Sequence, residues 1–358
     1  DTRNVVTSQA IYAGNNIKLV EKGVRVDSSL YERLVRHKLV PQIDECLMAE
    51  DGVDQQTLLD YAKKLLDERL DFPLLDSRPD YRERMLQAIA GIPLPPPLAF
   101  KLTVAQCQRP EIFDHSIRIA LISLYLAIRS QQHSDQELVW LAAAAVLHDI
   151  GMLHIPRDLL QSGYRMEQGE RRHLYAHPIT GFLILSKHPQ CHPHISRPVF
   201  EHHERLDGSG YPDRLAGDAI SPMARMAAIV DVYDAITADR CYHKGMPAAE
   251  ALRKMWEWSS AHFDQKLLQA FMRCVGIYPV GSLVRLESGR LGVVTEQNEA
   301  SLLTPRLRVF FSTKSNGYIK PELVDLGRKL GNGGGDRILS AEVPEKWGVD
   351  PQRFLLAE

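Results

Sequence analysis

Histidine and aspartate residues recur at regular intervals along the middle of the chain. The series consists of His115, the pair His148-Asp149, His177, the pair His202-His203, and Asp231. Its groups are 25 to 33 residues apart, which leaves room for one helix and a turn between them. Successive helices of a compact bundle can each bring one ligand to a common centre, and imidazole with carboxylate suits iron, manganese or zinc. The series therefore predicts a metal site assembled by a helical bundle.

Two neighbours strengthen this prediction. Glu111 lies four residues before His115, so one helix face would carry both side chains. His202 and His203 are adjacent, and adjacent helical residues point about 100° apart, so both reach one centre only if it lies between them or holds more than one metal. A lone histidine is more often a surface or core residue. That interpretation fits six of the histidines outside the series, which are His37, His133, His188, His192, His194 and His262.

The elements that must position these ligands are predicted to be helices. Helical periodicity runs almost unbroken over residues 98–275, with the glycine-rich stretch 207–212 as its main interruption. Ser221 followed by Pro222 predicts a helix start, because the hydroxyl can cap free amides and proline suits the first helical position. Asp231 and Asp234 then lie one turn apart on that helix. The fold class is therefore predicted to be mainly α.

The rest of the chain divides around this helical block. Residues 1–90 predict a small mixed and helical unit, regulatory or dimerising, and the proline-rich stretch 91–97 is the predicted boundary after it. Alternating strands over 279–330, with Asn316-Gly317 as a hairpin turn, predict a small antiparallel β unit. Residues 331–358 are predicted to be a glycine-rich linker and a tail.

The composition excludes several classes of protein. The sequence of 358 residues is 44% hydrophobic and 25% charged, with a formal net charge of −2, which is typical of a soluble globular protein and not of one that coats nucleic acid. Its five cysteines are scattered and never spaced as CxxC. No apolar run approaches the roughly 20 residues of a membrane span. We therefore expect a cytoplasmic protein that binds neither a membrane nor a nucleic-acid polymer.

Three strings in the helical block resemble a known family. They are His148-Asp149-Ile150-Gly151, the stretch HHERLDGSGYP at 202–212 and the stretch DVYDAITADR at 231–240. They are similar to the HD-GYP subgroup of HD-domain phosphohydrolases over about residues 105–275. The resemblance implies an HD-type helical core, hydrolysis of the bacterial second messenger cyclic di-GMP to pGpG or GMP, and a di- or trinuclear iron or manganese centre.

The resemblance also assigns roles to residues. It implies that Asp149 bridges two metals and that Glu111 is an additional carboxylate of members with three metals. The implied ligands are Glu111, His115, His148, Asp149, His177, His202, His203 and Asp231. Two metals lower the pKa of a shared water towards neutrality, which gives a hydroxide without any protein nucleophile. For the proton that the leaving ribose oxygen needs, our hypotheses are Asp234 or a metal-bound water.

Substrate contacts are implied at the two signature motifs, with two departures from the family. Arg240 matches a phosphate-binding arginine and Tyr211 a substrate-facing tyrosine. Where the family usually has a lysine after the His-Asp-Ile-Gly string, this chain has Met152. The basic position three residues after Arg240 is His243, with Lys244 as a substitute.

These departures keep alternatives open. One is a related substrate, such as pGpG or a hybrid cyclic dinucleotide. Another is a signalling module that binds a cyclic dinucleotide or a diguanylate cyclase domain with little turnover. A nucleotide phosphohydrolase of the wider superfamily is disfavoured because those proteins lack the Gly-Tyr-Pro loop. A homodimer is also compatible with the sequence.

Overall fold

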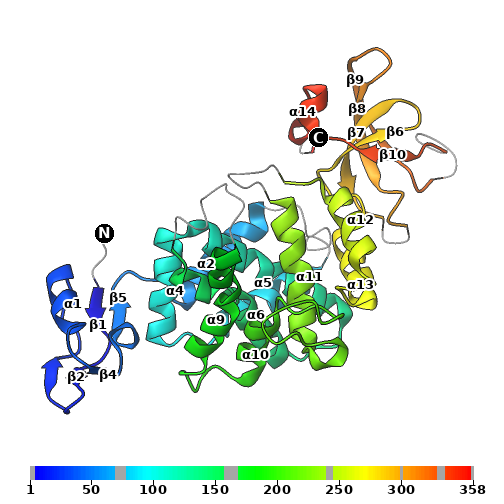
Figure 1. The fold of residues 1–358 in the computed structure, drawn as a ribbon. Helices are drawn as coiled ribbons and strands as arrows, with labels where there is room; N and C mark the ends of the chain where they lie inside the picture. Colours follow the sequence, from blue (N-terminus) through cyan, green and yellow to red (C-terminus); the bar gives the residue numbers. More distant parts are fainter. Residues whose placement is uncertain are drawn as a thin grey trace. The chain divides into compact units, whose positions relative to one another are not determined.

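The computed structural model describes residues 5–68, 78–156, 168–238, 245–298, 301–328 and 335–355 (Figure 1). Contacts between residues divide the chain into two units. The first comprises Asp1–Lys64, Met85–Leu121 and Ser134–His203, and the second comprises Leu65–Arg84, Ile122–His133 and Glu204–Glu358. This division cuts across the domain boundaries expected from the sequence, which remain predictions.

The first unit starts with a small module of short strands. Strand β1 pairs with β5 in antiparallel fashion, and β2 lies between β3 and β4 in a second sheet. Ile11, Leu34, Cys46 and Leu47 form its buried core. The elements are β1 (Val5–Thr7), β2 (Ile11–Ala13), β3 (Lys18–Val20), α1 (Ser28–Leu34), β4 (Leu39–Val40), η1 (Ile43–Glu45) and β5 (Leu47–Ala49). We call these residues, 5–49, the N-terminal module; its mixed character agrees with the sequence-based expectation.

Helices make up the middle of the chain, so the mainly α fold class is confirmed (Figure 1). They run from α2 to α13 without a strand among the described elements. Of these helices, those before residue 204 are α2 (Gln55–Glu68), α3 (Pro79–Ala90), α4 (Pro96–Gln108), α5 (Pro110–Ser130), α6 (Asp135–Leu147), η2 (Ile150–His154), α8 (Gln168–Tyr175), α9 (His177–Leu185) and α10 (Pro193–Glu201).

Helix α6 is the buried centre of the first unit. Ser134 and Glu137 cap its start reciprocally, and every residue from Leu141 to Leu147 is buried. Helix α10 packs against α6 and α9, and α9 packs against η2. The expectation that no apolar run approaches the length of a membrane span was wrong for one stretch of the described residues. Asp135–His154 is long and apolar enough to span a membrane, and 61% of its apolar 18-residue window is buried inside the protein. That burial is what a core helix shows.

The second unit contains the later helices and a β sheet. Helices α11 (Pro222–Thr237), α12 (Ala248–Trp258) and α13 (Gln265–Val275) pack on one another, after the short turn η3 (Gly217–Ala219). Pro222 occupies the first helical position of α11 as predicted, but the Ser221 side chain makes no capping hydrogen bond. Hydroxyl capping of that helix was therefore a wrong prediction.

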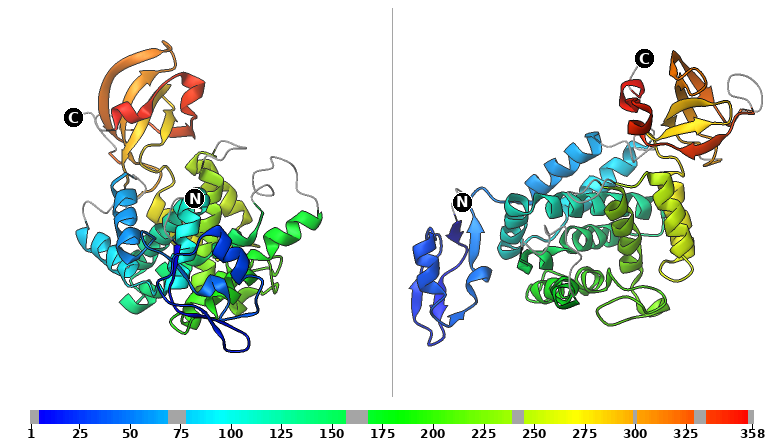
Figure 2. Two further views of the ribbon diagram at one scale, coloured as in Figure 1. Left: turned by 90° about the vertical axis from the view of Figure 1, so that its left-hand side faces the viewer. Right: turned by 45° about the horizontal axis from the view of Figure 1, so that its top comes forward.

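Five antiparallel strands follow in the order β10-β6-β7-β8-β9, and the sheet is strongly curved (Figure 2). They are β6 (Leu283–Leu286), β7 (Arg290–Glu296), β8 (Arg306–Ser312), β9 (Gly317–Asp325) and β10 (Ile338–Ala341). Asn316, with φ of 48°, lies in the turn before β9, as the sequence predicts.

The C-terminal segment is more structured than the expected linker and tail. Strand β10 pairs with β6, and α14 (Pro344–Trp347) and η4 (Pro351–Phe354) follow it. Phe354 stacks on Phe310 of the sheet with ring centroids 4.0 Å apart. Burial of these aromatic rings explains why the segment folds onto the sheet.

Candidate metal centre

The six predicted ligands that follow Glu111 in the first unit lie at or near helix ends. His115 is in the second turn of α5, His148 is the C-cap of α6, Asp149 is the N-cap of η2, His177 is the first residue of α9, His202 is the C-cap of α10, and His203 follows it. Helix ends converge where the chain turns, so each turn presents one ligand to the same place. This arrangement is the one that the spacing of the series predicts.

The structure gathers these side chains into two groups of three. His177, His202 and His203 form one group, and His115, His148 and Asp149 form the other. Within each group, one ligand atom of every residue lies within 4.8 Å of those of the others. Four of the six residues are buried. Asp149 and His203 are partly buried.

Asp149 joins the two groups through its two oxygens. Its Oδ1 lies 3.2 Å from Nε2 of His177 and 3.9 Å from Nε2 of His202. Its Oδ2 lies 3.5 Å from Nε2 of His148, in the other group. One carboxylate therefore faces both groups, which is the geometry expected of a bridging ligand.

Backbone carbonyls fix the orientation of three of the imidazoles. The Nδ1 atoms of His148, His177 and His202 lie 2.8, 2.6 and 2.7 Å from the carbonyl oxygens of the residues three positions earlier, Ala145, Leu174 and Val199. A carbonyl oxygen only accepts, so each Nδ1 carries the proton and each Nε2 presents a lone pair. Metal-binding histidines are commonly oriented by such a hydrogen bond from the second ring nitrogen.

Two of the resulting lone pairs, those of His177 and His202, face each other. The Nε2 atoms of His177 and His202 are 3.2 Å apart, although two acceptors cannot bond to each other. Two nitrogens that are each about 2.1 Å from one ion lie about 3.0–3.4 Å apart at ordinary coordination angles. The Nε2 of His148 is buried and has no hydrogen-bond partner among the described residues. The donor set therefore fits metal ions.

Burial and neighbouring charges shift the pKa values of Asp149 and His202. For Asp149 the largest single influence is burial, which raises the pKa. His148, His177 and His202 together outweigh it and hold the pKa well below the usual value. Burial, followed by the neighbouring histidines, lowers the pKa of His202 well below its usual value. An ionised carboxylate and neutral imidazoles are the forms that bind metals.

A glycine allows η2 to approach the start of α9. A β-carbon on Gly151 would lie 2.1 Å from the carbonyl oxygen of His177 and 2.8 Å from the backbone nitrogen of Gly181. Any larger residue at position 151 would separate η2 from α9. The contact explains how Asp149, just before η2, comes close to His177.

The other predicted ligands are placed differently. Glu111 is exposed in the first turn of α5 and belongs to neither group of three. Asp231 is buried on α11, one turn before the buried Asp234, in the second unit. The participation of Glu111 and Asp231 stays a prediction.

The glycine-rich loop that contains Tyr211 is held by a buried carboxylate in the same unit. Glu204 accepts hydrogen bonds from the backbone nitrogens of Asp213, at 2.7 Å, and Leu215, at 2.9 Å. Arg205 beside it is partly buried. Burial lowers the pKa of its guanidinium, while Asp231 and Tyr211 act in the opposite direction.

No role was predicted from the sequence for Glu204 or Arg205, although both directly follow the histidine pair. Met152 is partly buried in η2, and its backbone nitrogen donates to the carbonyl of Asp149 at 2.8 Å. Arg240, His243 and Lys244 lie outside the described residues.

The sequence of the chain is similar to those of known proteins. A family model described as an HD domain matches residues 103–267. The cyclic di-GMP phosphodiesterase PA4108 of Pseudomonas aeruginosa is 44% identical over 247 residues, which are 69% of this chain and 59% of the relative. The 3'3'-cGAMP-specific phosphodiesterase 3 of Vibrio cholerae is 33% identical over 176 residues, 49% of this chain and 38% of the relative. The chain thus spans less than two thirds of the length of these curated relatives.

The chain also has similarity to a solved structure. Bd1817, a protein of Bdellovibrio bacteriovorus described as an HDG"Y"P protein, matches 76% of this chain and 94% of its own, with 17% sequence identity and a TM-score of 0.42.

Proposed function

The chain belongs to the HD domain family through residues 103–267, and from this membership we propose that it is a metal-dependent phosphodiesterase that hydrolyses a cyclic dinucleotide. We propose cyclic di-GMP as the substrate, with pGpG, GMP or both as products. The relative with 44% identity is named for that activity, and another relative is named for 3'3'-cGAMP. We also propose that the protein acts in the cytoplasm.

The observation that carries this proposal is the position of Asp149 between two groups of ligands. Its two oxygens face Nε2 of His177 at 3.2 Å and Nε2 of His148 at 3.5 Å. A pair of sites bridged by one carboxylate is the arrangement that two-metal hydrolases use. Imidazole and carboxylate without thiolate suit iron or manganese, which we propose as the native metals.

The chain's own residues would divide the work as follows. His115, His148 and Asp149 would hold one ion, and His177, His202 and His203 the other. When bound, two such ions activate a water as the nucleophile and neutralise charge on the phosphoryl oxygens. Asp231 would complete the ligand set, as Glu111 would in a trinuclear centre.

Substrate binding and proton transfer fall to the remaining motif residues. Asp234 would give a proton to the ribose oxygen that leaves. Tyr211 would face the substrate, and Arg240 would bind a phosphate, since a planar guanidinium suits bidentate contact with phosphate oxygens. His243 or Lys244 would add positive charge that Met152 cannot supply. A diguanylate cyclase partner and a homodimer remain predictions.

Product analysis tests the proposal. Protein purified without oxygen and assayed for metal would be incubated separately with cyclic di-GMP and 3'3'-cGAMP, and the products separated by chromatography. We expect linear dinucleotide or mononucleotide from cyclic di-GMP, and none from an Asp149→Asn control. Protein that holds two or more metals, binds cyclic di-GMP and yields no product would instead support a receptor.

A further inference from the structure

Four basic side chains gather in the first unit outside the metal centre. They are Lys101 of α4, His154 of η2, and Lys187 and His188, which follow α9. Burial is the main cause that lowers the pKa of Lys101, His154 and His188, and nearby positive charge adds to it. Lys187 lowers the pKa of Lys101, and Lys101 lowers the pKa of His154. Both lysines lower the pKa of His188. We call these four residues the basic face, and a face of this kind attracts anionic groups.

The anions come from η1 of the N-terminal module. The Nζ of Lys187 lies 2.5 Å from Oε1 of Glu45 and donates to Oε1 of Gln42 at 3.3 Å. Asp44 raises the pKa of both Lys101 and His154, against the effect of burial. Glu45 does the same for Lys101 and His188. The charge of η1 is thus complementary to the basic face.

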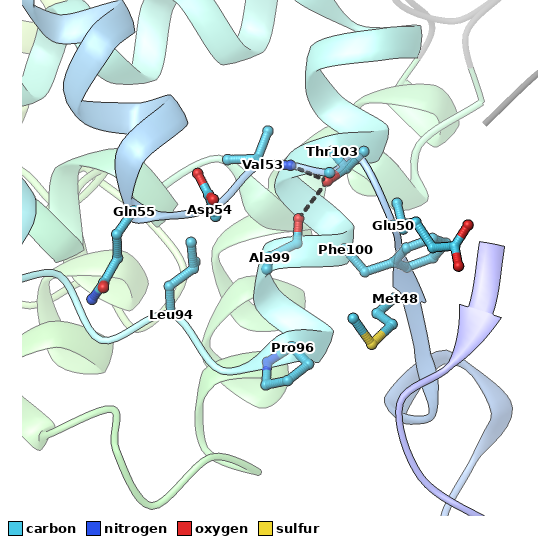
Figure 3. A pocket seen from close by; sticks show the side chains of 12 residues that line it. Met48, Glu50, Val53, Asp54, Gln55, Leu94, Pro96, Ala99, Phe100 and Thr103 are labelled. Atoms are coloured by element: carbon cyan, nitrogen blue, oxygen red, sulfur yellow. Dashed lines mark hydrogen bonds between the residues drawn. The ribbon is translucent and has the colours of Figure 1, made fainter. Parts of the chain in front are cut away.

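An open pocket lies between strand β5 of the N-terminal module and helix α4. Phe100 of α4 packs against the core of the N-terminal module, and α4 contacts both η1 and β5. Figure 3 shows Phe100 and Met48 beside a pocket of about 360 Å³, lined by residues 48–50, 52–55, 94, 96, 99, 100 and 103. The pocket is open to solvent, and the polar residues Glu50, Asp54 and Gln55 in its lining are exposed. Packing between the module and helix α4 therefore does not fill this part of their contact.

Helix α4 is joined at its other end to the helix that follows Asp149. Arg109, the C-cap of α4, donates from Nη2 to the carbonyl of Ile155 at 2.8 Å, and Ile155 is the C-cap of η2. Arg109 is buried, and α4 packs on η2. A displacement of α4 would therefore be passed to η2 and to Asp149.

We propose that η1 docks on the basic face as a releasable latch, and that the docked state holds α4 and η2 where Asp149 can join the two ligand groups. The latch is closed in this structure, in which the ligands converge. Exposed ion pairs each contribute little stability, so a signal received by the N-terminal module could open the latch. The coupling to Asp149 rests on the proposed metal site, and the docking of η1 does not.

Charge exchange in the full chain tests the proposal. The variants are Glu45→Lys, Lys187→Glu and the double exchange, with Glu257→Lys as a control, since Glu257 pairs with Arg253 on an exposed face of α12. Hydrogen exchange would be measured for peptides covering 39–49 and 150–156, and binding of Mn²⁺ by calorimetry. Each single variant should speed exchange in both peptides and weaken Mn²⁺ binding about five-fold or more, and the double exchange should restore both. The control should change neither.

Three outcomes would overturn the latch. They are unchanged exchange in the single variants, no restoration in the double exchange, or faster exchange at 39–49 while 150–156 and Mn²⁺ binding stay unchanged. Because neither readout is catalytic, a protein that shows the latch but hydrolyses no cyclic dinucleotide would count against the proposed function alone.

Discussion

The carbonyl oxygen of His177 occupies the space beside Gly151, where a β-carbon would come within 2.1 Å of it. Backbone lies on both sides of this contact, so no side-chain rotation can relieve a clash. The distance between η2 and α9 is therefore set by the absence of a side chain at position 151, and with it the distance from Asp149 to His177.

Gly151→Ala is expected to separate η2 from α9. Overpacking of this kind costs about 1–3 kcal/mol of stability. We also expect the metal-to-protein ratio to fall, because Asp149 can no longer reach both groups. Thermal unfolding and elemental analysis measure the two effects. Gly317→Ala is the matched control, since a β-carbon there would meet its nearest neighbour at 3.8 Å. Full metal content in Gly151→Ala would contradict the role given to this contact.

Asp149→Asn tests the bridge while keeping the shape of the side chain. The amide has one oxygen and no charge, so it cannot serve both ligand groups. We expect bound metal to fall from two or more ions to one or none, and turnover to fall at least about a hundred-fold, as for loss of several kcal/mol of transition-state stabilisation. Metal analysis and kinetics on the same preparation measure both. Retention of two ions would show that Asp149 is not the bridge.

The convergence of the candidate histidines could be predicted from the sequence, and their detailed geometry could not. The intervals between His115, His148, His177 and His202 each leave room for one helix, and they predict four separate helices. The structure has each of these residues on, or at the end of, a different helix. The shared use of Asp149 depends on how the chain turns between α6 and η2, which no periodicity encodes. The same limit applies to the carbonyl partners of the Nδ1 atoms.

The C-terminal segment could not be predicted for a different reason. Strand β10 has four residues and follows a glycine-rich stretch, so its local pattern is typical of a tail. Its stability comes from pairing with β6, a contact distant in sequence. Glu342 adds to it by accepting hydrogen bonds from Ser340, Lys346 and Trp347 at 2.7, 2.8 and 2.9 Å.

Glu342 should make the second unit sensitive to acid. Burial raises its pKa, but the hydrogen bonds from Lys346, Ser340 and Trp347 outweigh burial and lower the pKa to about 2. Because the folded value lies below the unfolded one, the stabilisation is complete above about pH 5 and is lost as the pH falls towards 2. Denaturant unfolding from pH 6 to 3 should show this loss, on the order of 2 kcal/mol, and Glu342→Gln should reduce the slope. Equal slopes would rule out Glu342 as the cause.

Glu204 is expected to position the loop that carries Tyr211. It accepts hydrogen bonds from the backbone of Asp213 and Leu215, and burial raises its pKa against the effect of these bonds. Glu204→Ala leaves two backbone donors without their acceptor, which should raise KM about ten-fold or more. Glu204→Gln keeps one acceptor oxygen, so KM should rise less than in Glu204→Ala. Metal content should not change in either variant, and a loss of metal would mean that Glu204 supports the centre instead of the loop.

Met152→Lys should increase activity if the missing lysine limits substrate binding. Met152 lies in η2, three residues after Asp149, and its backbone is tied to the Asp149 carbonyl. A charge-assisted hydrogen bond to phosphate contributes about 1.5–3 kcal/mol, so kcat/KM for cyclic di-GMP should rise ten-fold to a hundred-fold. The gain should shrink at high salt because a new cation is screened. Met152→Leu keeps the apolar packing and should leave kcat/KM unchanged. A lysine variant with unchanged or lower kcat/KM would indicate that other residues, such as His243 or Lys244, already provide the phosphate contact.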